Sequence, residues 1–203
     1  MSLSTNTIIS SLVSASNPVL KINEVGGRQW YRKPKDGRRG PWLSAQFEFL
    51  DKAIWERRGP CIYFVTDQNE VLRYVGISLN KLSDRWRTSP AFTESDEPLS
   101  GDEIFHSQCW HRIAHPTERE ASPFIISVLS GNEVLAFLPS IDHELSSLAV
   151  LRNDPDIIVT VLELWVCKYG HSTLWNKALT GGKKPRALRT DVLTQRKLHR
   201  SGC

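Results

Sequence analysis

The sequence predicts a mixed α+β protein, and three segments lead to that prediction. Two short apolar runs rich in β-branched and aromatic residues, 61–66 and 72–77, are joined by the turn-forming residues 67–70 and predict a β-hairpin. The run 124–129 has the composition of a further strand. Over 155–169, apolar residues recur at helical spacing, which predicts a long helix. The chain has no internal repeat, so repeat architectures are not expected.

The N-terminal part contains one predicted helix. The first 40 residues are loop-like in composition after a short apolar start, and 34–41 holds two prolines and two glycines, which is turn chemistry. Apolar side chains at helical spacing then predict an amphipathic helix over 43–57, which stops at the following Gly-Pro. After the hairpin, residues 80–87 favour another helix.

The central part is predicted to be mostly loop. Prolines and a glycine between 88 and 121 mark loops around one candidate short helix at 102–114. Residues 134–138 are a strand candidate that follows 124–129 across a Ser-Gly-Asn turn, and 143–151 is expected to be helical.

The long C-terminal helix has clear ends. Asp154 suits the N-cap, Pro155 suits the first helical position, and Gly170 suits the end. A buried strand is the alternative for 157–161, where every residue is β-branched. On the helical interpretation Glu163 lies roughly 145° from the centre of the predicted apolar stripe, at about 100° per residue, and faces outward.

Composition places the chain in a broad class. It has 203 residues, of which 40% are hydrophobic and 24% charged, so disorder and collagen-like folds are excluded. No apolar run approaches the ~20 residues that cross a bilayer, and no basic residue precedes the first apolar stretch, so we expect a cytoplasmic protein without a membrane partner. The four cysteines include no C-x-x-C pair, which argues against a disulfide scaffold and a two-knuckle zinc site.

The net charge of +4 is modest, but basic residues gather in two stretches with aromatic neighbours in the first. Such segments suit a polyanion, because Lys and Arg displace counterions from phosphates and planar groups stack. A solvated loop and tail are the alternative. The residues expected to contact nucleic acid are Arg28, Arg32, Lys33, Arg38, Arg39, Arg87, Lys183, Lys184 and Arg186.

A set of short motifs resembles the GIY-YIG nuclease family. Cys61-Ile62-Tyr63 and Tyr74-Val75-Gly76 lie on the two hairpin strands, with ten residues between the tyrosines. Arg85 follows on the next predicted helix, and Glu163 and Asn176 lie on and after the long helix. Each motif alone is weak, but their order and spacing together are similar to those of that family.

The resemblance implies a fold and a division of the chain. The implied core is a small three-stranded, mainly antiparallel sheet flanked by helices, with N-terminal and central elaborations. The core would span 59–180 with an insertion at 88–122. Residues 1–58 would form an N-terminal segment and helix with DNA contacts, and 181–203 a basic tail.

The resemblance also implies phosphodiester hydrolysis with a single divalent metal, Mg²⁺ or Mn²⁺. Glu163 would be the one protein ligand of the metal, and Arg85 would neutralise charge on the phosphoryl oxygens. Tyr63 would be the general base or would position water, with Tyr74 as its hydrogen-bonded partner. Asn176 would hold the glutamate loop or a metal-bound water.

The function expected from this resemblance is a DNA endonuclease of the type II restriction kind, acting on double-stranded DNA. A non-catalytic nucleic-acid-binding or regulatory protein on the same scaffold is one alternative. A structure-specific or homing nuclease is another.

Three positions depart from the family pattern. Cys61 replaces the first glycine, Ile77 stands where many members carry a lysine, and Ser89 stands where some carry a histidine. Each site residue also has a structural interpretation: both tyrosines as strand aromatics, Arg85 as a solvated residue and Glu163 as a surface carboxylate. Glu144 is the second choice of carboxylate. The His106, Cys109, His111 and His115 cluster has metal-ligand composition, but its spacing fits no zinc finger.

A single active site cuts one strand, so cleavage of a duplex predicts a homodimer on DNA. The contact is expected from the apolar N-terminal residues Ile8, Ile9 and Leu12, or from the 88–122 insertion. A monomer that nicks is the alternative.

Overall fold

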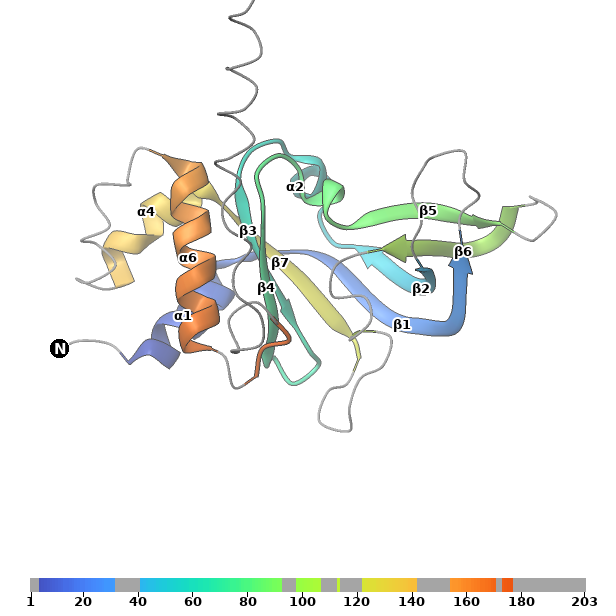
Figure 1. The fold of residues 1–203 in the computed structure, drawn as a ribbon, viewed down its shortest axis with the longest axis horizontal. Coiled ribbons are helices and arrows are strands. Elements are labelled where there is room, and N and C mark those ends of the chain that lie inside the picture. Colours follow the sequence, from blue (N-terminus) through green and yellow to red (C-terminus); the bar gives the residue numbers. More distant parts are fainter. Residues whose placement is uncertain are drawn as a thin grey trace, which may run out of the picture.

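The computed structural model describes residues 4–31, 41–92, 98–106, 113, 122–141, 154–170 and 173–176. In the described chain one antiparallel sheet of seven strands runs in the order β4-β3-β7-β1-β2-β6-β5 (Figure 1). The strands are β1 (Asn17–Tyr31), β2 (Pro41–Phe49), β3 (Cys61–Thr66), β4 (Leu72–Ser78), β5 (Arg87–Phe92), β6 (Pro98–His106) and β7 (Phe124–Ser130). The helices are α1 (Thr5–Ala15), α2 (Lys52–Glu56), the 3-10 helix η2 (Leu82–Asp84), α4 (Gly131–Ile141) and α6 (Pro155–Tyr169).

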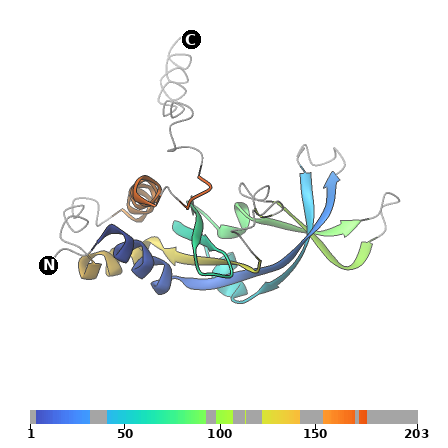
Figure 2. The same cartoon turned by 90° about the horizontal axis from the view of Figure 1, so that it is seen from below.

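The α+β class is confirmed, but the expected three-stranded sheet is wrong. Hairpin strands β3 and β4 form one end of the sheet, and β7 and then β1 continue it. Helices α1, α4 and α6 lie together at this end, whereas β2, β5 and β6 extend the other end (Figures 1 and 2). None of the helices in the described ranges is long and apolar enough to cross a membrane.

The sequence predicted that the N-terminal residues are loop-like, but they form α1 and β1. Ser4 caps α1 by accepting a hydrogen bond from the Thr7 amide at 3.2 Å. Strand β1 pairs with β7 on one side and β2 on the other. Ile8, Ile9 and Leu12 are buried in the core, so they are not the exposed dimer contact that we expected. Partners distant in sequence decide this structure, and local composition does not reveal them.

The helix predicted over 43–57 is also wrong: most of it is strand β2, followed by the short α2. In β2 the apolar residues Ala45, Phe47 and Phe49 alternate with exposed polar ones, which is the period of a strand. Phe47 and Phe49 pair with residues of β1. This strand pairing decides their conformation, although the spacing of the apolar residues that follow also fits a helix. Asp51 then caps α2 through the Ile54 amide at 2.8 Å.

The predicted hairpin is confirmed as β3 and β4, with Tyr63 opposite Gly76. Its turn is built on the buried Asp67, whose carboxylate accepts from the Asn69 and Val71 amides at 2.9 and 3.1 Å. Arg73 donates to the same carboxylate at 2.8 Å. The helix predicted over 80–87 is only the single turn η2.

Three central predictions are corrected. Residues 134–138 belong to helix α4 and not to a strand, because Ser130 and Glu133 form a capping box. Residues 98–106 form β6, paired with β2 and β5, so the candidate helix at 102–114 is wrong over 102–106. The loop expected from 88 begins as β5. The helix expected at 143–151 lies outside the described residues.

Helix α6 is confirmed with the predicted ends. The Asp154 carboxylate accepts from the Asp156 and Ile157 amides at 3.0 and 3.2 Å, and the Gly170 amide donates to the Val166 carbonyl. The alternative of a buried strand over 157–161 is therefore wrong. The buried side chains of α6 are Ile158, Val159, Leu162, Val166 and Cys167, so the buried face is rotated from the predicted apolar stripe.

Two hydrophobic clusters occupy opposite faces of the hairpin. Ile62 and Phe64 of β3 point into the cluster formed with α1, α4 and α6. The alternate residues Cys61, Tyr63 and Val65 belong to a second cluster, which contains Trp55, Trp86 and residues of β1. Alternation along β3 therefore places the motif residues Cys61 and Tyr63 on the face away from α6.

Candidate active site

The two motif tyrosines are stacked over the hairpin. The Tyr63 and Tyr74 ring centroids lie 6.0 Å apart with 28° between the ring planes. Tyr63 is 2% exposed, whereas Tyr74 is half-buried. The edge of Trp86 packs on Tyr63 with a centroid separation of 6.1 Å.

Gly76 makes this stack possible. A Cβ atom at position 76 would lie 2.5 Å from the Tyr63 hydroxyl and 2.9 Å from the Tyr74 ring. No side chain fits at that distance, so steric contact with the two tyrosines requires a glycine at this position of the second motif.

Arg85 lies directly after η2, and its amide donates to the Leu82 carbonyl at 2.9 Å. Its side chain is exposed and forms no ion pair with any other described residue. Burial raises the pKa of the Cys61 thiol to about 11, while a backbone hydrogen bond at Ser78 and the Arg85 charge partly oppose that rise. The same charge also acts on the Glu163 carboxyl.

Glu163 does not face outward, as predicted, but lies at the edge of the buried face of α6. At about 100° per residue, Glu163 lies roughly 65° from the centre of the buried face. The angle differs from the predicted one because the buried face is centred on other residues than the predicted apolar stripe. Its side chain is half-buried. Burial raises the pKa of the Glu163 carboxyl, and the positive charge of Arg85 opposes the rise. Glu163 and burial together raise the pKa of the Cys167 thiol to about 12.

Asn176 binds β4 and not the helix that carries Glu163. Its side-chain amide donates to the Val75 carbonyl at 2.7 Å, and its oxygen accepts from the Val75 amide at 3.1 Å. The Trp175 amide donates to the Arg73 carbonyl at 2.6 Å. Because β4 ends the sheet, these contacts cover an edge that would otherwise expose unpaired backbone groups.

The structure thus brings the predicted residues together only in part. The tyrosines lie on one face of the hairpin with Trp86, and Glu163 is carried by the helix that packs on the other face. Arg85 interacts with groups on both faces, since its positive charge lowers the pKa of both Cys61 and Glu163 against the effect of burial.

Two arginines that sequence reasoning missed lie beside this site. Arg57 and Arg58 line a cavity of about 200 Å³ together with Cys61, at the start of β3. Gly59, at a φ of 122°, reverses the chain between these arginines and the strand. The signal in the sequence was an Arg-Arg pair immediately before the Gly-Pro that precedes the first motif.

Most of the predicted nucleic-acid contacts cannot be placed. Arg28 lies in β1 and Arg87 begins β5. The seven others named in the sequence analysis lie outside the described residues, as do Glu144, Cys109, His111 and His115. The ranges that the structure describes contain no group of three or more side chains suited to a metal ion.

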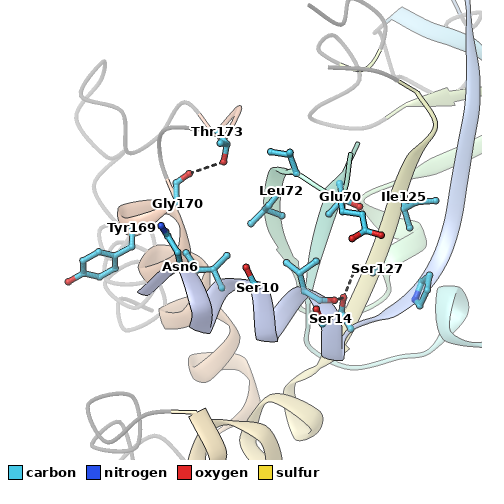
Figure 3. A pocket seen from close by; sticks show the side chains of 16 residues that line it. Asn6, Ser10, Ser14, Glu70, Leu72, Ile125, Ser127, Tyr169, Gly170 and Thr173 are labelled. Carbon is cyan, nitrogen blue, oxygen red and sulfur yellow. Dashed lines mark hydrogen bonds between the residues drawn. The ribbon is translucent and has the colours of Figure 1, made fainter. Parts of the chain in front are cut away.

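A larger cavity, of about 770 Å³, lies away from these residues (Figure 3). It is bounded by α1, the turn of the hairpin and the C-terminal end of α6, and its walls are rich in serine and threonine hydroxyls. Glu70 is the only charged side chain among its lining residues. The described residues that line this cavity therefore offer no cation to bind a phosphate.

Comparisons of the chain with protein-family models, with curated proteins and with solved structures found no match.

Proposed function

We propose that this protein is a metal-dependent endonuclease of the type II restriction kind, which hydrolyses phosphodiester bonds of double-stranded DNA. The observation that carries the proposal is that the charge of the exposed Arg85 acts on the half-buried Glu163 carboxyl, while the stacked tyrosines lie on the hairpin against which the helix of Glu163 packs. A cation, a carboxylate and hydroxyl groups are the groups that such a hydrolysis uses.

The residues present suit a divalent metal. Mg²⁺ is a hard cation that keeps several waters and is bound through one or two carboxylates plus substrate phosphate. Glu163 would hold it, because burial raises the pKa of this carboxyl and a nearby cation would offset the cost of its charge. The bound metal would supply an activated water and neutralise charge on the phosphate.

The side chains of this protein would share the remaining work. Water attacks the phosphorus and gives up a proton to solvent, the bond to the leaving oxygen breaks, and that oxygen takes up a proton from solvent. Negative charge grows on the phosphoryl oxygens in between. Arg85 stabilises that charge through its planar set of donors. Tyr74, the less buried tyrosine, positions the water, and Tyr63 holds Tyr74 in place through the stacked rings.

The second candidate is a non-catalytic nucleic-acid-binding protein on the same scaffold. Ile77, where many family members carry a lysine, packs against the core on the α6 side. Tyr63 is almost fully buried, which limits its contact with water or phosphate. These two observations favour a site that binds DNA without cutting it.

Cleavage of plasmid DNA separates the two candidates. We expect cleavage with Mg²⁺ that EDTA abolishes. Glu163→Gln and Arg85→Ala should each lower the rate at least ~10²-fold while DNA binding persists. Glu70→Gln and Lys52→Ala remove the same kinds of charge at exposed positions and should leave the rate unchanged. Cleavage at the wild-type rate by either site variant would exclude the assigned roles, and binding without any cleavage would establish the second candidate.

A further inference from the structure

The cavity next to the first motif is basic. Arg57 and Arg58 are the only charged residues among its lining residues, which otherwise come from the start of β3, the end of β7 and the first residues of α4 and α6. Arg58 forms no ion pair and no side-chain hydrogen bond with the described residues. Two guanidinium groups on a small concave surface without an acidic neighbour in its wall attract an anion.

The acidic group that forms an ion pair with an arginine of this cavity neutralises it weakly. Glu133 lies 3.8 Å from Arg57, and the two side chains are 38% and 49% exposed, so solvent screens the pair. The Glu133 carboxylate is already used, since it accepts the Ser130 amide at 2.6 Å in the capping box of α4. The Gly131 amide is also occupied, because it donates to the Pro60 carbonyl at 2.8 Å. The guanidinium groups are therefore the charged donors in the described lining that remain for a ligand.

The cavity adjoins the proposed catalytic site. Cys61 lines it, and the Arg85 charge acts on the thiol of the same Cys61. Three arginines thus surround the start of β3, and two of them, Arg58 and Arg85, have no acidic partner in the described chain. We infer that Arg57 and Arg58 bind a backbone phosphate of DNA next to the phosphodiester that Arg85 contacts. This inference rests on the proposed function and names a further contact of that site.

Binding of a short duplex, measured by fluorescence anisotropy at several salt concentrations with EDTA present, tests the inference. Each phosphate contact contributes ~0.9 to the slope of log affinity against log salt. We expect Arg57→Gln/Arg58→Gln to reduce the magnitude of that slope by about 0.9, the contribution of one phosphate, and Arg57→Lys/Arg58→Lys to retain it, because lysine keeps the charge. Lys52→Gln, which removes one exposed positive charge from the adjacent α2, is the control and should leave the slope unchanged.

The outcomes distinguish this inference from the proposed function. An unchanged slope in the folded double glutamine variant, with wild-type DNA binding, would overturn the phosphate contact and leave the nuclease proposal standing. If the wild-type protein binds no duplex at any salt concentration, both are wrong.

A second observation, independent of the first, concerns the outer side of α6. Ile157, Leu164 and Tyr169 are 41%, 51% and 43% exposed, and the half-buried Val161 lies between the first two. In Figure 3 the Tyr169 ring points away from the neighbouring cavity. The spacing of Ile157, Val161, Leu164 and Lys168 is 4, 3 and 4 residues, which is the spacing of a helix-packing seam.

The charges on this seam favour a second copy of the same chain. In an antiparallel pair of α6 helices about a two-fold axis between 162 and 163, Val161 meets the partner's Leu164. Asp154, the N-cap residue at the same side of the helix, then lies near the partner's Lys168. In this antiparallel arrangement the positive N-terminal end of each helix dipole also lies beside the negative C-terminal end of the other, which is favourable. We propose that α6 packs against α6 of a second copy through this seam.

The dimer should be weak, because one helix face buries less than the ~800 Å² per partner of a standard interface. Light scattering over a protein concentration series, with and without a duplex, should show mass rising toward two chains. Leu164→Glu should keep the protein monomeric, whereas Leu79→Glu, an equally exposed leucine outside α6, should dimerise as the wild type does. Lys168→Glu should also weaken the dimer, because it puts a negative charge opposite the partner's Asp154. A wild-type monomer under every condition, or a Leu164→Glu variant that still dimerises, would overturn this interface.

Discussion

Glu163 is the residue on which the proposed chemistry depends most, and burial sets its titration. Burial raises the pKa of the Glu163 carboxyl above its ordinary value of 4.5, and the Arg85 charge opposes that rise. Because the folded-state pKa is the higher one, folding favours the protonated form. The stability that Glu163 contributes is therefore complete below the unfolded-state pKa and is lost as the pH rises through the folded-state pKa.

The corresponding prediction is a pH-dependent difference in melting temperature. Glu163→Gln, which is neutral at every pH, should melt above the wild type at neutral pH, and the difference should shrink as the pH falls toward 4.5. Mg²⁺ should raise the melting temperature of the wild type at neutral pH but not that of Glu163→Gln. The exposed Glu70→Gln serves as control. Equal melting temperatures of wild type and Glu163→Gln at neutral pH would contradict the burial argument.

At the scale of elements, the hairpin holds the site because its outer edge is covered. Asn176 bonds both backbone groups of Val75, which lies between Tyr74 and Gly76 of the second motif. A side-chain amide here takes the place of a neighbouring strand. The position of Tyr74 therefore depends on a residue that is 101 positions from its neighbour Val75 in the sequence.

We predict that Asn176→Ala lowers the free energy of unfolding by about 1–2 kcal/mol, because it leaves two backbone groups of β4 without this partner. Urea unfolding measures this loss, and hydrogen exchange at the Val75 amide should become faster. Thr173→Ala, which removes an exposed hydroxyl in the same segment, should change neither. Val75 exchange as slow as in the wild type would show that Asn176 does not hold the strand.

At the scale of the whole molecule, the N-terminal residues belong to the core that supports the catalytic hairpin. Leu12 is fully buried in the cluster that also holds Ile62 and Phe64 of β3. The Ser16 hydroxyl, just after α1, donates to the buried Ser127 hydroxyl of β7 at 2.6 Å. Helix α1 is thus attached to the sheet by packing and by hydrogen bonding.

Leu12→Ala should therefore destabilise the protein by about 2–5 kcal/mol through the cavity that it creates. The salt dependence of DNA binding should stay unchanged at temperatures where the variant is folded, since Leu12 contacts no ligand. Ser14→Ala, an exposed change on the same helix, should leave the unfolding free energy unaffected. A loss below 1 kcal/mol for Leu12→Ala would mean that α1 is not packed on this core.

Short-range signals in the sequence predicted the hairpin and α6. The turn at 67–70 and the Asp154 and Gly170 caps form hydrogen bonds with backbone groups a few residues away. These local interactions do not depend on which distant segments pack nearby. The same kind of signal was present for α4, where Ser130 and Glu133 form a capping box, but the apolar run after it was interpreted as a strand. The site residues themselves came from the order and spacing of short motifs.

Tertiary structure alone decided the rest. Residues 43–49 became a strand because β1 and β6 supply backbone partners for β2, although their apolar residues also suit a helix. Glu163 became half-buried because α6 packs with a face that its apolar pattern does not single out. Both results depend on which distant segments pack together, and a helix that is apolar on two sides does not specify from its own sequence which side meets the sheet.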